Sequence, residues 1–300
     1  MQTGILTYKI ILTAVLMSAS NIATMGQTTL QVITKTIEKS FTASSSTNLK
    51  IEGEKSTIKI NTWSKNEVNV VLKLISKSPE RETAEKELAY QRYILEKKKE
   101  TIYMKNYLAM PKSVPKLSSI QVASYEVTIP RGCKIALFNQ YGDVDISNLF
   151  GVLTLEVKYG KIKLENLNAA VQVQSYFGDL IVRNVDGQVD IIANHTKINL
   201  DAIAGDVKLR STLGDVFVGN IDDIKSLEIV ASKADITLEN PDYQKFKFSL
   251  RSEFGDVLVP MKYEKYFKVK NRGNKSFIYQ PLEKESSISL RTSFGNIIAK

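Results

Sequence analysis

Hydrophobic and polar residues alternate one by one through most of the chain beyond residue 130. Val144 and Ile146 flank Asp145, and residues 153–157 read Leu-Thr-Leu-Glu-Val. A period of two residues is typical of a β-strand that buries one face. Each alternating stretch is short and ends at a polar or glycine-containing turn. The pattern therefore predicts an all-β region made of short strands.

Nine turns recur along this region at a nearly constant spacing. Most contain an aromatic residue, then Gly, then Asp or Asn, and they follow one another at a period of about 18 positions that widens slightly toward the C-terminus. A second turn lies between them, so each repeat holds two strands, and the fixed period indicates a repeat architecture. We expect glycine at both turns to provide the positive φ of a tight bend. The first residues of the nine turns are Tyr141, Tyr159, Phe177, His195, Leu213, Lys233, Phe254, Arg272 and Phe294.

Two topologies fit these repeats. Gly-Asp between alternating strands is a hairpin signal, which would give a long antiparallel meander. Alternatively, each repeat is one coil of a β-solenoid, with equivalent strands stacked along the axis. We favour the solenoid because stacking places the repeated residues in contact, whereas a meander gives no reason for a fixed period. The prediction is a parallel β-solenoid, or β-helix, of about 18-residue coils over residues 133–300.

Stacking would align equivalent turn residues into columns. The column after the glycine alternates in sign over its first five members, and opposite charges on neighbouring strands stabilise a ladder. Its members there are Asp143, Lys161, Asp179, Lys197 and Asp215. The column before the glycine begins with Tyr141, Tyr159 and Phe177. Such an aromatic strip either docks sugar rings or closes the core.

The residues before the repeats predict a second region, 27–132, that is β-rich and irregular. Runs rich in Val, Ile, Thr and aromatic residues predict strands at 31–41, 49–51, 57–63, 67–75, 101–107 and 120–129. Strong helix formers between two of these runs predict one helix at about 82–98, ending in three lysines that suit a helix C-terminus. Two prolines and small polar residues predict a loop at 109–119.

Residues 1–26 have the layout of a signal peptide. Lys9 precedes an apolar run at 10–17, and small and polar residues follow up to a cut before Gln27. The run is too short to span a bilayer, which takes about 20 apolar residues. We therefore expect an exported protein, periplasmic or extracellular in a Gram-negative bacterium, with no transmembrane segment after leader removal. The chain has one cysteine, Cys133, which we expect to be buried at the start of a strand.

Composition and charge agree with a folded, exported chain. Hydrophobic residues make up 43% of the sequence, and removing a leader that carries only Lys9 lowers the net charge from +9 to +8. Residues 245–300 hold 12 Lys or Arg against 5 Asp or Glu. A basic end attracts anionic partners, although charges on strand faces also keep sheet edges soluble. The candidate interaction residues in this end are Lys262, Tyr263, Tyr266, Arg272 and Tyr279.

The residues argue against catalysis, metals and cofactors. The turn acids are spread one per coil and are interrupted by Lys161 and Lys197, so they specify neither a paired-carboxylate site nor a calcium repeat. His195 is the single histidine, which excludes sites with several His ligands. The sequence also lacks a phosphate-cradling glycine loop. We expect a protein that is not an enzyme and has no cofactor and no nucleic-acid partner.

Several segments in order resemble the putative adhesin family of exported bacterial proteins, a domain of unknown function. They are Lys39-Ser40-Phe41, residues 58–63 leading into 66–68, residues 125–130, and the repeats that begin at Tyr141-Gly142-Asp143-Val144. The resemblance covers most of residues 30–300 and implies a β-solenoid, export and surface interaction. It supplies no catalytic residue. Thr196 and Ala234 stand at two glycine positions, which raises the question of whether those coils turn in the same way.

The hypothesis is a noncatalytic exported cell-envelope or surface protein, either a structural scaffold or an adhesin-like interaction module. Its partner would be an envelope polysaccharide or another surface protein. The alternative is a carbohydrate-binding or carbohydrate-cleaving β-helix. A cleaving enzyme would show a groove with clustered carboxylates. Sugar binding by the basic end predicts that Tyr263, Tyr266 and Tyr279 point outward together.

Overall fold

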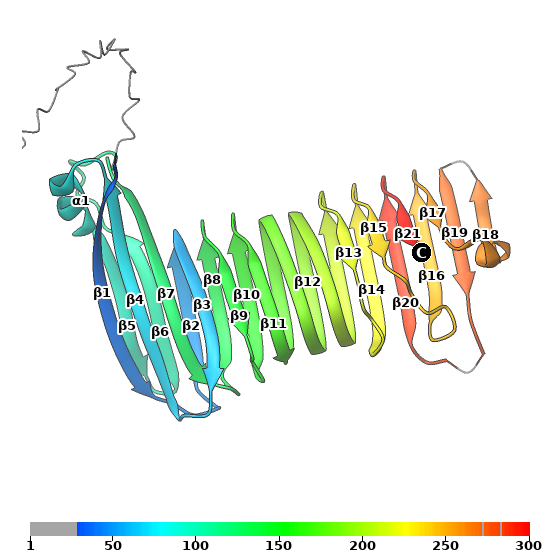
Figure 1. Cartoon of the computed structure of the whole chain (residues 1–300), viewed down its shortest axis with the longest axis horizontal. Helices are drawn as coiled ribbons and strands as arrows, with labels where there is room; N and C mark the ends of the chain where they lie inside the picture. Colours follow the sequence, from blue (N-terminus) through cyan, green and yellow to red (C-terminus); the bar gives the residue numbers. More distant parts are fainter. Residues whose placement is uncertain (1–28, 272, 283) are drawn as a thin grey trace, which may run out of the picture.

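The computed structural model describes residues 29–271, 273–282 and 284–300, and it is an elongated stack of β-strands (Figure 1). The only helical segments in this part of the chain are α1 (Arg81–Leu88) and the 3₁₀ helix η1 (Met261–Tyr266). The all-β prediction is confirmed. The strands are β1 (Gln31–Thr42), β2 (Asn48–Glu54), β3 (Ser56–Trp63), β4 (Glu67–Ser78), β5 (Gln91–Lys98), β6 (Thr101–Leu108), β7 (Ile120–Pro130), β8 (Lys134–Gln140), β9 (Val144–Ser147), β10 (Val152–Lys158), β11 (Ile162–Asn168), β12 (Ala170–Thr212), β13 (Val216–Val218), β14 (Ile224–Ser232), β15 (Ile236–Leu238), β16 (Lys247–Glu253), β17 (Val257–Leu258), β18 (Phe267–Asn271), β19 (Asn274–Tyr279), β20 (Ser287–Ser293) and β21 (Ile297–Ala299).

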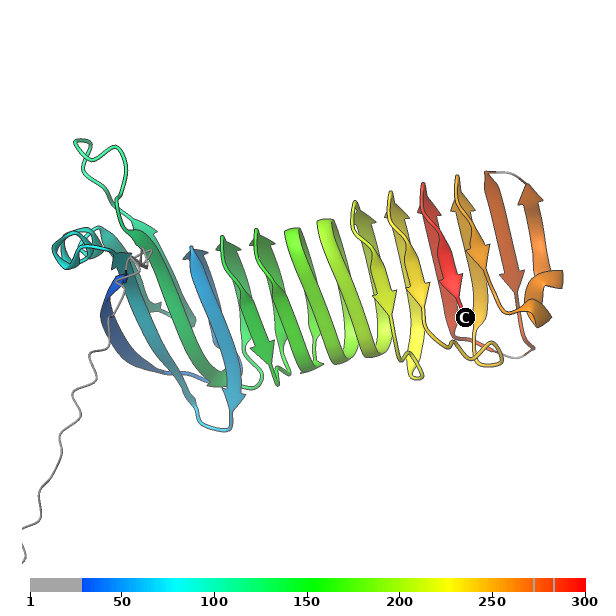
Figure 2. The ribbon, with the colours of Figure 1, turned by 45° about the horizontal axis from the view of Figure 1, so that its top comes forward.

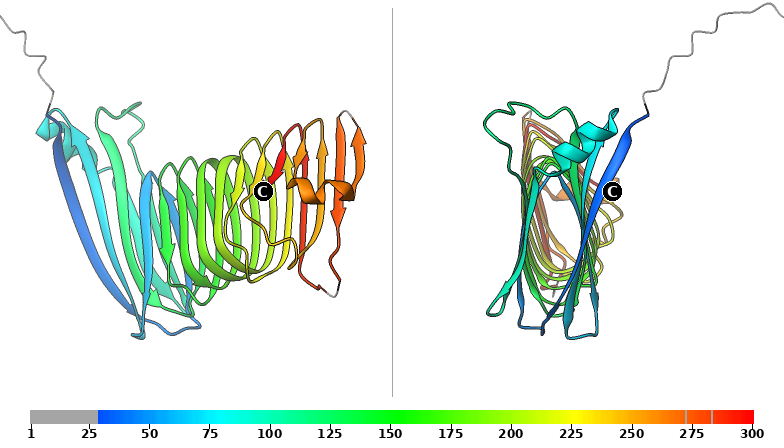
Figure 3. Two further views of the ribbon diagram at one scale, coloured as in Figure 1. Left: turned by 45° about the vertical axis from the view of Figure 1, so that its right-hand side comes forward. Right: turned by 90° about the vertical axis from the view of Figure 1, so that its left-hand side faces the viewer.

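The strands form two long faces that enclose the core, as the end-on view shows (Figure 3). On the first face, Val152 of β10 lies between Lys134 of β8 and Ala170 of β12, in parallel register and one repeat period from each. On the second face, Ile162 of β11 lies between Val144 and Leu180 with the same offset. β12 spans 43 residues and runs through several passes without interruption. The stack is therefore solenoid-like, with parallel ladders on both faces.

The interior is filled by the apolar residues that alternate along each strand. Leu153, Leu155 and Val157 of β10 point inward and are at most 1% exposed. Inward residues from all parts of the stack, from Phe41 to Ala299, belong to one continuous core. A strand with one buried face buries every second side chain, which is why the period-two pattern predicted these strands.

At the N-terminal end, the coil order departs from the sequence order. β2 pairs in parallel with β8, and β3 pairs with β9, so residues 48–63 form the coil that lies directly under residues 134–147. β6 and β7 lie on the other side of that coil. This coil therefore stacks on the first coil of residues 133–300, and the repeat period does not reveal it because other elements intervene in the sequence.

At the C-terminal end, the last coil is inserted between two earlier ones. β20 pairs with β14 on one side and β16 on the other, and β21 lies likewise between β15 and β17. Figures 1 and 2 show the red strands β20 and β21 between the yellow and orange ones. The predicted sequential stacking of the last turns is therefore wrong. Instead of adding a coil, β18 and β19 form an antiparallel hairpin that extends the first face beyond β16.

The predicted helix at 82–98 is half the predicted length. α1 ends at Leu88, and residues 91–98 form β5, which pairs antiparallel with β6. Tyr93, Ile94 and Leu95 favour a strand, and pairing with β6 overrides the helix preference of the flanking Glu and Lys residues. Lys97 caps no helix, because its Nζ donates to the Thr42 carbonyl at 2.8 Å.

α1 is held to the stack by a buried carboxylate. Glu87 is only 8% exposed, and its oxygens accept the backbone N–H groups of Ser118 (3.0 Å) and Ser119 (2.8 Å) and the Ser119 hydroxyl. These serines end the loop between β6 and β7, which agrees with the predicted loop at 109–119. Burial raises the pKa of Glu87, but the three donors outweigh it and lower this pKa below its ordinary value.

Replacing Glu87 with Gln should destabilise the protein by about 1–3 kcal/mol, because an amide cannot accept all of these donors. The pKa of Glu87 is lowered on folding, so its contribution is present above the unfolded pKa of about 4.3 and is lost as the pH falls through the folded value. Urea denaturation between about pH 3 and 7 checks this. The variant should lose part of the pH dependence, whereas Glu82→Gln, at an exposed position of the same helix, should not. Equal pH profiles for the two variants would contradict the assignment.

Residues 1–28 lie outside the described residues, and with them the predicted signal peptide. In the part of the chain that the structure describes, no helix is long and apolar enough to cross a membrane.

Candidate functional site

The first corner of each coil has one backbone geometry along the whole stack. The residue before the glycine position has a positive φ, as at Tyr141 (61°), Tyr159 (59°) and Phe177 (60°). His195 and Lys233 have it as well, at 51° and 53°. The coils with Thr196 and Ala234 therefore turn in the same way as the others. The expectation that glycine supplies the positive φ at this corner is wrong.

In the coils that hold glycine at this corner, its role is a different one, which is the close approach of the neighbouring coil. A Cβ added to Gly160 would lie 2.1 Å from the Gly142 carbonyl oxygen, and one on Gly178 would lie 2.0 Å from the Gly160 carbonyl oxygen. Both distances are far inside van der Waals contact. The corner glycines thus allow equivalent backbones to stack directly on one another.

The residues with positive φ form an exposed aromatic column. Tyr141 stacks on Tyr159 and Tyr159 on Phe177, each with ring centroids 5.0 Å apart, and Phe177 stacks on His195 at 4.6 Å. Tyr141, Tyr159 and Phe177 are 50%, 47% and 44% exposed, so the column does not close the core. The ring faces are turned toward one another, and solvent reaches mainly their edges. Because sugar rings stack on aromatic faces, this column is a poor sugar platform.

The column of turn acids contributes to the stack through backbone hydrogen bonds. The Lys161 N–H donates to the Asp143 carboxylate at 2.8 Å, and the Asp235 N–H donates to Asp215 at 3.0 Å. Among the described residues, no ion pair joins neighbours in this column. The expected ladder of ion pairs is therefore absent, and the alternating side chains of the first five coils face solvent.

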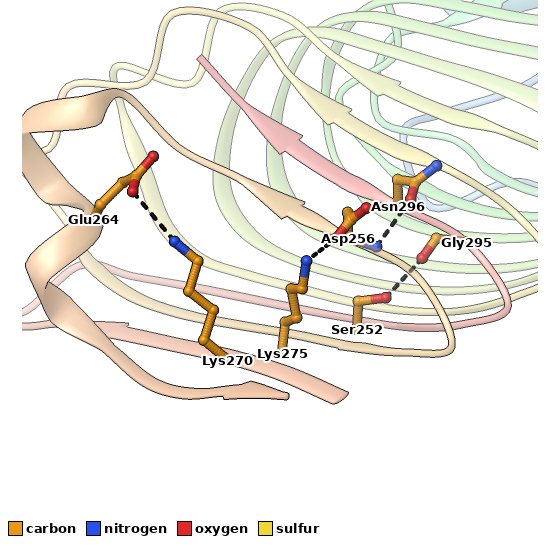
Figure 4. Close-up of polar contacts among 7 residues, drawn as sticks. All are labelled: Ser252, Asp256, Glu264, Lys270, Lys275, Gly295 and Asn296. Atoms are coloured by element: carbon orange, nitrogen blue, oxygen red, sulfur yellow. Dashed lines mark hydrogen bonds and ion pairs between the residues drawn. The ribbon is translucent and has the colours of Figure 1, made fainter. Parts of the chain in front are cut away.

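The same column continues through the inserted C-terminal coil (Figure 4). The Asp256 N–H donates to the Asn296 side chain at 2.9 Å, and the Ser252 hydroxyl donates to the Gly295 carbonyl at 2.7 Å. Lys275 of β19 forms an ion pair with Asp256. These contacts fix the last coil beside β16.

The second corner carries a ladder of asparagine side chains. Asn148, Asn166 and Asn184 have φ values of 62°, 56° and 51°, which asparagine tolerates better than most residues. Each amide donates to the asparagine of the coil before it, from Asn184 to Asn166 at 2.7 Å and from Asn166 to Asn148 at 3.3 Å. The ladder starts at Asn61. Asparagine therefore provides the positive φ that was expected from glycine at this corner, while Gly187 and Gly205 have positive φ further along the turn.

Replacing Asn166 with Ala should destabilise the protein by about 1 kcal/mol, because it breaks two ladder bonds and leaves alanine at positive φ. Asn168→Ala, at an exposed end of β11 without a positive φ, is the matched control. Urea denaturation of both variants checks the difference. An equal effect of the two substitutions would rule out a specific role for the ladder.

A groove of about 600 Å³ crosses the outer surface of the first face. Its outward side chains mix amides, charges and apolar groups, and they come from β2, β8, β10 and the first-face passes of β12. They are Lys50, Glu52, Ala136, Phe138, Thr154, Glu156, Gln172, Gln174, Asp190, Ile192, Lys208 and Arg210. These residues were not predicted from the sequence. The signal that could have found them is the solvent-facing position of each strand, followed from one repeat to the next.

Two of the three carboxylates that line this groove are paired with lysines, and the third, Asp190, accepts the side-chain amide of Gln188 at 3.2 Å. Glu52 lies 2.7 Å from Lys105 and 3.3 Å from Lys50, and Glu156 lies 3.0 Å from Lys158. The hydrogen bond from Lys105 lowers the pKa of Glu52 below its ordinary value, against the opposing effect of burial. A glycosidase acid needs a raised pKa, so Glu52 is unsuited to that role.

The candidate interaction residues of the basic C-terminal end include three tyrosines whose rings form a cluster. Tyr263, Tyr266 and Tyr279 are half-buried and pack against the core, and Tyr263 stacks on buried Tyr243 with centroids 4.1 Å apart. Tyr279 contacts both of the other two rings, and burial raises the pKa of its hydroxyl. Lys262 is exposed and lies over the Tyr263 ring. The three tyrosines thus lie together but do not point outward, and Arg272 lies outside the described residues.

Reactive groups are few. Cys133 is buried immediately before β8, as predicted, and burial raises the pKa of its thiol to about 11. Within residues 29–271, 273–282 and 284–300, no three His, Cys, Asp or Glu side chains gather as metal ligands would.

The family model described as Toastrack DUF4097 matches residues 46–298. The chain belongs to the Toastrack DUF4097 family. The match confirms the resemblance drawn from the sequence. The Toastrack range begins just before β2 and ends within β21, so it includes both coils that stack out of sequence order.

Two solved structures are similar to this Toastrack chain. One is a putative adhesin from Bacteroides fragilis, 14% identical, with 89% of this chain and 97% of that chain covered and a TM-score of 0.43. The other is a putative cell adhesion protein from Clostridium sporogenes, 14% identical, with 89% and 99% covered and a TM-score of 0.23. A search of curated proteins finds no matching sequence.

Proposed function

We propose that this protein is a noncatalytic scaffold or adhesin-like module of the cell envelope or surface, built on a parallel β-solenoid of about 18-residue coils. The observation that carries the proposal is the single core that runs from Phe41 to Ala299. Every coil is fixed to the next by ladders and corner bonds, and each adds about 4.8 Å of length. Such a stack is a stiff spacer that presents long faces to a partner.

The ends of the stack support a discrete rod rather than a growing filament. At the N-terminal end, Lys39 donates to the Leu95 carbonyl and Lys97 to the Thr42 carbonyl, both at 2.8 Å, which links β1 to β5. At the other end, the edge strand β18 carries exposed Lys268 and Lys270. Lysines on edge strands disfavour pairing with further strands.

Export and surface display belong to the same proposal. They are supported by the signal-peptide layout of the first residues and by the resemblance to exported proteins. The partner would be an envelope polysaccharide or another surface protein. The absence of catalysis is supported by the lysine-paired carboxylates Glu52 and Glu156 in the groove of the first face.

That groove favours carbohydrate binding as a second candidate function. It is large enough for a short oligosaccharide, and Gln172, Gln174 and Arg210 offer amide and guanidinium donors above an apolar floor. This candidate places sugar binding on the first face, away from the aromatic column and the tyrosine cluster.

A polysaccharide array with the purified protein, at low and at physiological salt and with product analysis, tests both candidates. The scaffold proposal expects no released sugar from any glycan. Salt-resistant binding would identify the groove as the binding site if the double variant, Gln174→Ala with Arg210→Ala, abolishes it. Lys262→Ala is the matched control. Release of sugar would overturn the noncatalytic assignment.

A further inference from the structure

The exposed first corner of five successive coils carries two neighbouring rows of side chains. The corner stripe consists of Tyr141, Tyr159, Phe177, His195 and Leu213, all exposed. Two residues further along the chain in each coil lies the charge row, which consists of Asp143, Lys161, Asp179, Lys197 and Asp215, also exposed. The stripe is apolar for most of its length, and the row alternates in sign.

Contacts within the chain do not fully occupy either row. Of the charge row, Asp143 and Asp215 each accept one backbone N–H, which leaves further acceptor positions on their carboxylates. Lys161, Asp179 and Lys197 take part in none of the ion pairs of the described residues. On the other side of the stripe, the charged residues in the two nearest outward rows of the described structure are Lys158 and Glu156, which pair with each other at 3.0 Å, and Arg210 in the coil of Leu213. The stripe is thus bordered by alternating charges on one side only.

We propose that this corner is a self-association surface on which a second copy of the chain binds antiparallel, stripe against stripe. A two-fold axis across the stripe places the charge row opposite the partner's charge row. If the axis passes between the coils of Lys161 and Asp179, each Lys161 faces a partner Asp179, and each Asp143 faces a partner Lys197. All four contacts join opposite charges. The proposal needs only the fold and does not rest on the proposed function.

Other arrangements of two copies lack this complementarity. An axis that passes through one coil places like charges opposite each other, which is unfavourable. An axis between the coils of Asp179 and Lys197 opposes Asp143 to the partner's Asp235. A parallel pair sets the charge row against the other side of the partner, where Arg210 is the one charge near the stripe that forms no ion pair among the described residues, so only Asp215 of each copy meets an opposite charge. The alternation therefore selects both the orientation and the register.

The contact area predicts a weak dimer. Five coils extend over about 20–25 Å, and a stripe about 15 Å wide buries roughly 300–400 Å² on each copy. Stable interfaces bury about 1,200–2,000 Å² in total, so association on the order of 100 µM to 1 mM is expected. Such a contact would operate where many copies are held side by side.

Sedimentation equilibrium of the full chain from about 10 µM to about 1 mM tests the proposal. The average mass should rise toward that of a dimer. Lys161→Asp should weaken association roughly tenfold, because two contacts become repulsive. Exchanging the two charges in one chain (Lys161→Asp with Asp179→Lys) should restore it, because the exchanged pair again joins opposite charges across the axis. At about 1 M salt the three proteins should associate alike.

Lys134→Asp is the matched control, since Lys134 is exposed on the first face between Asn48 and Val152. It should leave association unchanged, and thermal unfolding should show that all variants are folded. A monomer over the whole concentration range would overturn the proposal. So would an exchanged variant that associates no better than Lys161→Asp.

Discussion

Deletion of residues 286–300 is expected to unfold the C-terminal end of the stack rather than to shorten it by one coil. These residues form β20 and β21, which lie between β14–β15 and β16–β17. Without them, β16 and β17 lose their parallel partners, and one edge of β14 is left unpaired. Ile288, Leu290 and Ile297 alone are each at most 1% exposed, and burial of such side chains contributes about 1.5–3 kcal/mol each. A loss of more than about 5 kcal/mol is expected.

Hydrogen exchange on the truncated and the full chain measures this effect. Amides of β16, β17 and β19 should lose their protection, whereas amides of β10 and β11 should keep it. Leu282→Ala is the control for a change in this region, because Leu282 is 90% exposed. Full protection of β16 after the deletion would mean that the last coil stacks on the end of the other coils, in sequence order.

Gly178→Ala is expected to destabilise the protein by about 3 kcal/mol or more, although alanine adds a single methyl group. The new Cβ would lie 2.0 Å from the carbonyl oxygen of Gly160, and a backbone atom cannot move away as a flexible side chain can. The coil must shift, and the shift disturbs the stacking of Phe177 on Tyr159 next to it. For a chain of this size the midpoint of thermal unfolding should fall by about 6–12 °C.

Ala234→Gly is the matched control for this corner. Ala234 occupies the same column and is only 3% exposed, so its coil already accommodates a Cβ. Its replacement should cost no more than about 1 kcal/mol, the ordinary effect of added chain entropy. Similar midpoints for Gly178→Ala and the unchanged protein would show that the column does not depend on close backbone approach.

The sequence predicted the strands and their spacing because both depend on local pattern. Alternation reports one buried face per strand, and the repeat period reports parallel register, as between Val152 and Ala170. The order of the coils depends on which strands pair across insertions, and a period cannot show that. The last turns of the motif predict further coils in sequence order. In the structure, the turn at Gly273 belongs to the β18–β19 hairpin, and the turn at Gly295 belongs to the inserted coil.

The chemistry of the corners was predictable only in part. The motif drew attention to the glycines, but positive φ belongs to the residue before them, and the glycines serve the approach of a neighbouring backbone. That approach is a contact between coils, so no single repeat encodes it. The aromatic column was visible in the sequence at Tyr141, Tyr159 and Phe177, while its exposure and the orientation of its rings required the stack.

The candidate interaction residues show the same limit. Lys262, Tyr263, Tyr266 and Tyr279 suggested a basic aromatic surface, but three rings that lie close in a fold can cover one another, as these do over Tyr243. The groove on the first face went unnoticed because its residues share no type. They share only a solvent-facing place in successive coils.

Disulfide formation between engineered cysteines tests the order of the coils most directly. Arg291 of β20 lies in register beside Val230 of β14 and Arg251 of β16, and all three side chains are exposed. Adjacent strands are about 4.8 Å apart and next-nearest strands about 9.6 Å, whereas a disulfide requires Cα atoms within about 7 Å. In a Cys133→Ser background, the stack with the inserted coil predicts that Val230→Cys with Arg291→Cys oxidises readily, and that Val230→Cys with Arg251→Cys does not. A disulfide in the second pair and none in the first would show that the chain stacks in sequence order, and would contradict the account.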